Sequence, residues 1–192
     1  MKNKCVFCEN GETAARELGG PVYHFCPRCG GIFLDTGSRL SPAEEKERYG
    51  LHENSLFDPG YRSYLEAFAD GVLDAAERAG GRGEAARIRT VLDYGSGPEP
   101  ALVQLLSGRG FQAVGYDPFF LPDGTGFPGG ADLVTCLEVA EHFFEPRKDF
   151  RLLAGRARPG GWCAIGTRLL ETPRADAGPW ESFNSWWYRQ DR

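Results

Sequence analysis

The sequence has no long apolar segment and no excess of basic residues. No apolar run approaches the roughly 20 residues that a membrane-spanning helix needs, and the first twenty residues lack the apolar region of a signal peptide. Lysines and arginines number 22 against 27 aspartates and glutamates, so the net charge is −5. No basic stripe of the kind that attracts a phosphate backbone is present. We therefore expect a cytoplasmic protein without a membrane partner, and a nucleic-acid partner is left open but disfavoured.

The composition favours a globular chain. Charged residues make up 26% and hydrophobic residues 41% of 192 residues, which leaves room for one full domain and a small module. Six cysteines are present. Two of them, Cys136 and Cys163, lie within apolar strand patterns, and we expect both to be small core residues.

The other four cysteines form two closely spaced pairs. Cys5-x2-Cys8 and Cys26-x2-Cys29 are separated by seventeen residues, a spacing typical of a four-thiolate zinc site. Disulfides are the alternative, but a cytoplasmic chain disfavours them. Four protein ligands leave no open coordination position, so the sequence predicts a structural zinc ion in a small zinc ribbon.

Residues 91–97, Val-Leu-Asp-Tyr-Gly-Ser-Gly, indicate an apolar strand that runs into a glycine turn, with a helix pattern beginning at Glu99. A second apolar strand ends at Asp117. A glycine turn lets a cofactor approach bare backbone, and a carboxylate at the end of the next strand can accept hydrogen bonds from ribose hydroxyls. Pro98 has no N–H and Glu99 would repel a phosphate, so the sequence favours a nucleoside cofactor without phosphates.

This pattern resembles the class I S-adenosylmethionine-dependent methyltransferases. "VLDYGSGPEP" is similar to their first motif, "ADLVTCLEVAEHFFEP" to the strand and turn beside the methyl donor, and "RPGGWCAIGTR" to the strand that follows. The resemblance covers roughly residues 87–170. It implies S-adenosyl-L-methionine as cofactor and a shortened doubly wound, Rossmann-like α/β sheet preceded by the zinc ribbon. The cofactor-binding residues that it implies are Asp93, Gly95, Ser96, Gly97, Asp117, Pro118 and Glu138.

Glu138-x-x-Glu141-His142 follows the predicted strand Ala131–Leu137, at the end where the cofactor would lie. His142 can act as a general base toward a substrate hydroxyl, with Glu141 beside it. The same three side chains can instead hold a divalent cation, and the string resembles that of metal-assisted O-methyltransferases. As an alternative, Glu138 only contacts the cofactor and His142 only caps the next helix.

Three sections follow from these motifs: a zinc ribbon at 1–40, a helical connector at 41–86 and a methyltransferase-like domain at 87–192. Ser41-Pro42 and Asp58-Pro59 are typical helix starts, and apolar residues recur at helical spacing after the second. The resemblance also places the connector across the cofactor. We therefore weigh Tyr61 or His52 as lining the site, against a packed tyrosine and a surface histidine.

The sequence departs from the family in two places. Only fourteen residues separate Asp117 from Asp132, and their prolines and glycines predict a loop in place of a helix and an edge strand. The chain also ends soon after the strand predicted at Trp162–Leu169. We expect a four-stranded sheet with a bare edge, available for self-association or covered by the aromatic tail "WESFNSWWYRQDR". Alternatively, the chain is a fragment of a longer protein, and we expect weak catalysis from it alone.

The sequence thus predicts a methyltransferase that acts on a small molecule or a hydroxyl acceptor. An RNA methyltransferase whose zinc ribbon grips the nucleic acid is one alternative. A non-catalytic binding module with a degenerate methyltransferase fold is the other.

Overall fold

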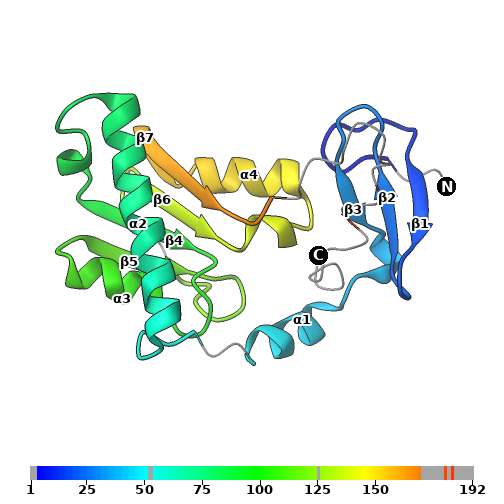
Figure 1. Ribbon diagram of the computed structural model, residues 1–192, viewed down its shortest axis with the longest axis horizontal. Coiled ribbons are helices and arrows are strands. Elements are labelled where there is room, and N and C mark those ends of the chain that lie inside the picture. Colours follow the sequence, from blue (N-terminus) through cyan, green and yellow to red (C-terminus); the bar gives the residue numbers. More distant parts are fainter. Residues whose placement is uncertain (1–3, 52–53, 125, 170–179, 181–182, 184–192) are drawn as a thin grey trace. The chain divides into compact units, whose positions relative to one another are not determined.

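The computed structural model describes residues 4–51, 54–124, 126–169, 180 and 183, and Figure 1 shows their arrangement into helices and strands. These residues divide by their contacts into two compact units. The small unit contains residues 1–41, 141–149 and 168–192, and the large unit contains residues 42–140 and 150–167. The contacts therefore group the connector with the sheet domain, whereas the boundaries expected at residues 40 and 86 stay predictions.

The small unit is built on a three-stranded antiparallel sheet of order β1-β2-β3. Its strands are β1 (Ala14–Glu17), β2 (Val22–Phe25) and β3 (Ile32–Leu34), followed by a 3-10 turn η1 (Thr36–Ser38). The central strand pairs Tyr23 with Leu34 and His24 with Phe33. Asp35 begins η1, because its side chain accepts a hydrogen bond from the Gly37 N–H.

The large unit contains a parallel sheet of order β5-β4-β6-β7, as predicted for a shortened α/β fold. Its elements are α1 (Pro42–Tyr49), α2 (Pro59–Gly80), η2 (Ala85–Arg87), β4 (Thr90–Tyr94), α3 (Ala101–Gly108), β5 (Gln112–Tyr116), β6 (Ala131–Leu137) and β7 (Ala157–Gly166). The turn η3 (Ala140–His142) and the helix α4 (Pro146–Ala154) connect β6 to β7 and include residues of both units. Within the described residues, no helix is long and apolar enough to cross a membrane.

Helix α2 begins where the sequence predicts. The Asp58 carboxylate accepts a 2.6 Å hydrogen bond from the Tyr61 N–H, and Pro59 occupies the first turn. Helices α2 and α3 pack their apolar side chains against β4 and β6. Leu65 of α2, Leu102 of α3 and Val91 of β4 are among the buried residues. This packing forms the main core of the large unit.

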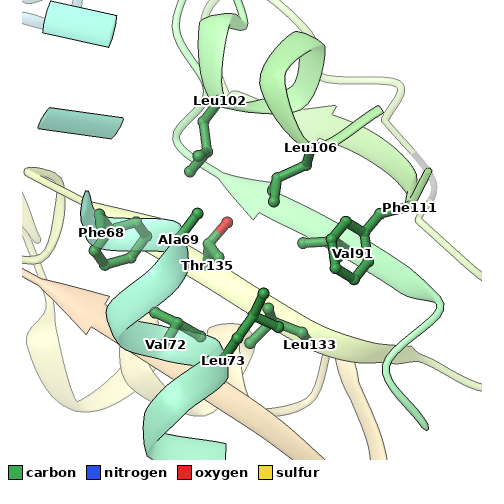
Figure 2. A pocket seen from close by; sticks show the side chains of 10 residues that line it. All are labelled: Phe68, Ala69, Val72, Leu73, Val91, Leu102, Leu106, Phe111, Leu133 and Thr135. Carbon is green, nitrogen blue, oxygen red and sulfur yellow. The ribbon is translucent and has the colours of Figure 1, made fainter. Parts of the chain in front are cut away.

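A small cavity of about 10 Å³ lies within this core, and Figure 2 shows its lining. The lining side chains come from α2, α3, β4 and β6 and from Phe111; all are apolar except Thr135. The volume is too small for more than a single water molecule, and the apolar lining gives a water few partners. The cavity is therefore a packing gap and not a ligand site.

The connection from Asp117 to Asp132 contains no helix among its described residues, as its glycines and prolines predict. Gly126 comes within contact of Leu92, since a Cβ placed on it would lie 3.7 Å from a Leu92 methyl group. Leu92 and Val91 point to opposite faces of β4, so the loop covers the face away from the α2–α3 core. The loop thus covers part of the sheet in place of the missing helix.

Two expectations need correction. Strand β7 spans Ala157–Gly166 and not Trp162–Leu169, because its pairing with β6 already begins with Ala157 opposite Ala131. The register then shifts before Trp162, and Gly160 takes a φ of +76° within this irregular stretch. Cys136 is buried as expected, but Cys163 is exposed, because β7 is an edge strand covered on fewer sides.

Whether the aromatic tail covers the sheet edge stays a prediction, because most of the tail lies outside the described residues. Of this tail only Trp180 and Phe183 lie within the described residues, and both pack against the three-stranded sheet of the small unit. The reason is an apolar face on that sheet, formed by Leu18, Tyr23 and Ile32.

Candidate functional site

The turn after β4 is held against the end of β5 by backbone hydrogen bonds. The N–H groups of Gly95 and Ser96 both donate to the Tyr116 carbonyl, at 2.7 and 3.1 Å. Gly95 has φ +83° and Gly97 has φ +68°, a region that side chains with a Cβ rarely adopt. A Cβ on Gly95 would lie 2.5 Å from Val139, whereas a Cβ on Gly97 would meet no atom within 4 Å. The turn is therefore packed at its first glycine and open at its second.

The Asp117 carboxylate lies beside this turn, as predicted. Its Oδ2 accepts a hydrogen bond of 3.0 Å from the Gly97 N–H. Its Oδ1 accepts from the N–H groups of Phe119 and Phe120, at 2.8 and 3.1 Å. Asp117 is buried, with 7% of its surface exposed. Since each carboxylate oxygen has about two acceptor positions, Oδ2 keeps one for a further donor such as a hydroxyl.

Asp93 is buried beneath the same turn. Its Oδ1 accepts a 2.8 Å hydrogen bond from the Thr135 hydroxyl on β6. Burial, with a smaller contribution from the Asp117 charge, raises the pKa of the Asp93 carboxyl to about 6, although the Thr135 hydrogen bond opposes this. Thr135 is a site residue that the sequence reasoning missed, because a threonine inside an apolar strand resembles an ordinary strand residue.

Glu138 ends β6 in an unusual backbone conformation. Its φ is +54°, which is uncommon outside glycine, and its N–H donates a 2.7 Å hydrogen bond to the Gly166 carbonyl. The Tyr64 hydroxyl on α2 donates to Glu138 Oε1 at 3.2 Å. In the sequence, Tyr64 stands at helical spacing among apolar residues, and that position gives no signal of this contact.

The other residues predicted for the site are Pro118, Glu141, His142, Tyr61 and His52. Pro118 is exposed directly after Asp117, and Glu141 and His142 lie half-buried in η3. Their catalytic role stays a prediction. Tyr61 packs against the core, and burial together with the Asp93 charge raises the pKa of its hydroxyl. His52 lies outside the described residues.

The residues at this strand end fit the nucleoside cofactor that the sequence predicts. The space beside Gly97 is open, and the Ser96 hydroxyl is buried without a hydrogen-bond partner among the described residues. A buried hydroxyl without a partner is costly, so a ligand that bonds to it would relieve that cost. Asp117, Gly97 and Ser96 are therefore residues that could hold a nucleoside cofactor, and their individual roles stay a prediction.

The four N-terminal cysteines come together in the small unit. Their Sγ atoms all lie within 4.8 Å of one another, and the pairs Cys5–Cys29 and Cys8–Cys26 are each 3.6 Å apart. A tetrahedral zinc site with sulfurs at about 2.3 Å sets its ligands about 3.8 Å apart. The donor set and its spacing therefore fit a zinc ion.

The pKa values of two of these thiols are shifted in opposite directions. Burial opposes ionisation of the Cys26 thiol, but the N–H groups of Cys29 and Arg28 outweigh it and lower its pKa to about 6. Burial raises the pKa of the Cys29 thiol to about 12, although the N–H of Gly31 opposes this. Zinc binds cysteine as the thiolate, so metal binding would release the proton of a thiol such as Cys29.

Comparisons with curated proteins find two relatives that are named as methyltransferases. The 48-residue stretches that match ubiquinone biosynthesis O-methyltransferases of Bordetella pertussis and Bordetella bronchiseptica are each 42% identical. Each match covers 25% of this chain and 20% of the relative, so the chain spans about a fifth of the length of these curated relatives. No solved structure matches the chain.

The family comparison extends further. A profile described as a methyltransferase domain matches residues 60–192, which is more than half of the chain and includes the glycine turn, Asp117 and Glu138. The chain therefore belongs to the methyltransferase domain family.

Proposed function

We propose that this protein transfers a methyl group from S-adenosylmethionine to a hydroxyl group of a small molecule. The observation that carries the proposal is the hydrogen bond between the Gly97 N–H and Asp117 Oδ2, which joins the glycine turn to the carboxylate at the end of the next strand. Membership of the methyltransferase family supports it. The two curated relatives, named as O-methyltransferases, favour an oxygen acceptor.

The residues of the site would have different roles in this reaction. Asp117 accepts hydrogen bonds from ribose hydroxyls, and the Gly95–Gly97 turn leaves room for the amino-acid part of the cofactor. S-adenosylmethionine, when bound, supplies a methyl group already activated on a sulfonium. The enzyme's part is then mainly to align the acceptor oxygen with that methyl group and to exclude water. His142 would accept the acceptor's proton, with Glu141 beside it.

We also propose that Cys5, Cys8, Cys26 and Cys29 bind one zinc ion with a structural role. All four ligands come from the protein, so no coordination position is left for a substrate or a reactive water. The spacing of the sulfurs supports this proposal.

Labelled methyl transfer tests the enzymatic proposal. The full chain is incubated with methyl-labelled S-adenosylmethionine and a panel of hydroxylated small molecules, with short RNA as the comparison. Transfer to a hydroxylated small molecule, reduced at least tenfold in His142→Ala and unchanged in the exposed-loop variant Asp123→Ala, is the expected result. Transfer to RNA alone would overturn the small-molecule acceptor, and transfer unaffected by His142→Ala would overturn the role of His142.

A further inference from the structure

The central strand of the small unit has two covered faces. Side chains alternate along β2, so Tyr23 and Phe25 point to one side and His24 to the other. The register with β3 places Leu34 beside Tyr23 and Phe33 beside His24. One short strand therefore takes part in two separate clusters.

The His24 face belongs to the cysteine site. The His24 ring stacks on Phe33, with centroids 5.3 Å apart and an interplanar angle of 20°. Phe33 packs in turn in a cluster with the buried Cys5 and Cys26. Cys26 follows Phe25 directly, so the last residue of β2 leads into the second cysteine pair.

The opposite face holds the two described residues of the C-terminal segment. The Phe183 ring meets Tyr23 edge-on at 4.9 Å, and Trp180 meets Phe25 at 6.3 Å. Phe183 is 8% exposed. The Arg16 guanidinium lies 6.0 Å from the centre of the Trp180 ring, at the outer limit of a cation–π contact.

This sheet is too small to be stable by itself. Its strands have four, four and three residues, and small sheets need a covering layer or a metal to form a stable fold. The cysteines close one face, and an aromatic pair from the far end of the chain closes the other. Because β2 belongs to both clusters, loss of packing on one face also destabilises the packing on the other face.

We propose that Trp180 and Phe183 form a clasp that completes the cysteine module, so that metal binding and the packing of these two side chains strengthen each other through β2. Trp180 and Phe183 are then held on the small unit while the metal is bound and are released when the metal is lost. Thermodynamic linkage makes the effect reciprocal, so loss of the clasp weakens metal binding by the same factor. The proposal rests on the zinc site and is independent of the methyl acceptor.

The experiment uses the full chain and starts with its zinc content. Zinc transfer to a chromogenic chelator is compared for wild type, Phe183→Ala and Trp180→Ala, with Phe57→Ala as a matched control because Phe57 is 98% exposed. Arg16→Gln is a milder variant, since it removes only the cation beside Trp180. We expect zinc affinity to fall by on the order of fivefold or more in the two clasp variants, less in Arg16→Gln, and not in Phe57→Ala.

Amide hydrogen exchange supplies the reciprocal measurement. Chelation should raise exchange in a peptide that covers residues 180–183 while β4 keeps its protection. Phe183→Ala should raise exchange in β2 with zinc still bound. The coupling is overturned if both clasp variants keep the zinc affinity of wild type. It is also overturned if chelation raises amide exchange in β4 as well. A purified wild-type protein without zinc overturns the metal site and the coupling together, and leaves the methyltransferase proposal in place.

Discussion

The backbone N–H of Gly97 donates a 3.0 Å hydrogen bond to Oδ2 of Asp117. This bond joins the turn after β4 to the end of β5, the two places that the sequence assigns to the cofactor. The carboxylate is therefore held in position before any ligand arrives, and a ligand need not spend binding energy on ordering it.

Replacing Gly95 tests how closely the turn is packed. Gly95 and Gly129 have nearly the same φ, +83° and +82°, but only at Gly95 would a Cβ collide with a neighbour, Val139. Gly129→Ala should cost about 1–2 kcal/mol from the backbone conformation alone. Gly95→Ala should cost clearly more and should also weaken binding of S-adenosylhomocysteine. Denaturant unfolding and calorimetry measure the two effects, and equal losses in both variants would contradict the packing argument.

The Asp93 carboxyl predicts a dependence of stability on pH. Its pKa is about 6 in the folded protein against 3.8 as the ordinary value, mainly because of burial. Between these values the folded state binds more protons than the unfolded state, so Asp93 lowers stability as pH rises from 3.8 through 6. The cost above pH 6 is roughly 3 kcal/mol. Asp93→Asn should therefore gain stability over wild type at pH 7.5 and little at pH 4.

Unfolding at the two pH values, without cofactor, measures this difference. Asp123→Asn is the control, because Asp123 is exposed. A gain for Asp93→Asn that is the same at both pH values would refute the shifted pKa.

The cap of α2 predicts a local effect on stability. The Asp58 carboxylate accepts the Tyr61 N–H, so Asp58→Ala leaves that donor without a protein partner. The expected loss is about 1 kcal/mol. Asp74→Ala, at an exposed position inside the same helix, should change stability by less than about 0.5 kcal/mol. The prediction fails if thermal unfolding does not separate the two variants.

Zinc content distinguishes the four clustered cysteines from the rest. Cys26→Ser removes one of four ligands, whereas Cys163→Ser changes an exposed cysteine on β7. Elemental analysis should find about one zinc per chain in wild type and in Cys163→Ser, and markedly less in Cys26→Ser. The large unit should stay folded in Cys26→Ser, because its core contains none of the four cysteines. Equal zinc in all three proteins would contradict the assignment.

Local patterns predicted the elements that build the site. The helix starts at Pro42 and Pro59, the strand Ala131–Leu137 and the loop after Asp117 all agree with the structure. These features depend on residues that are close in the sequence, such as a capping carboxylate, an apolar run or a cluster of glycines and prolines. The same holds for the cysteine pairs, whose spacing is itself the signal.

Contacts between distant segments were not predictable in this way. The Thr135–Asp93 hydrogen bond needs the order of the strands in the sheet, and the packing of Phe183 on Tyr23 joins residues 160 positions apart. The start of β7 was placed too late, because a proline and two glycines at 159–161 suggest a loop. Gly161 has a different reason for being glycine, since a Cβ there would lie 3.0 Å from the carbonyl oxygens of Ala131 and Asp132.

The most direct test of the account is calorimetric binding of S-adenosylhomocysteine to wild type, Asp117→Ala and Asp123→Ala. Asp117→Ala leaves the ribose hydroxyls without their charged acceptor and should weaken binding by about 10- to 150-fold. Asp123→Ala changes an exposed carboxylate in the same loop and should bind as wild type does. Thermal unfolding verifies that each variant is folded. Equal affinity in wild type and Asp117→Ala, or no binding to wild type, would contradict the assignment of this strand end as the cofactor site.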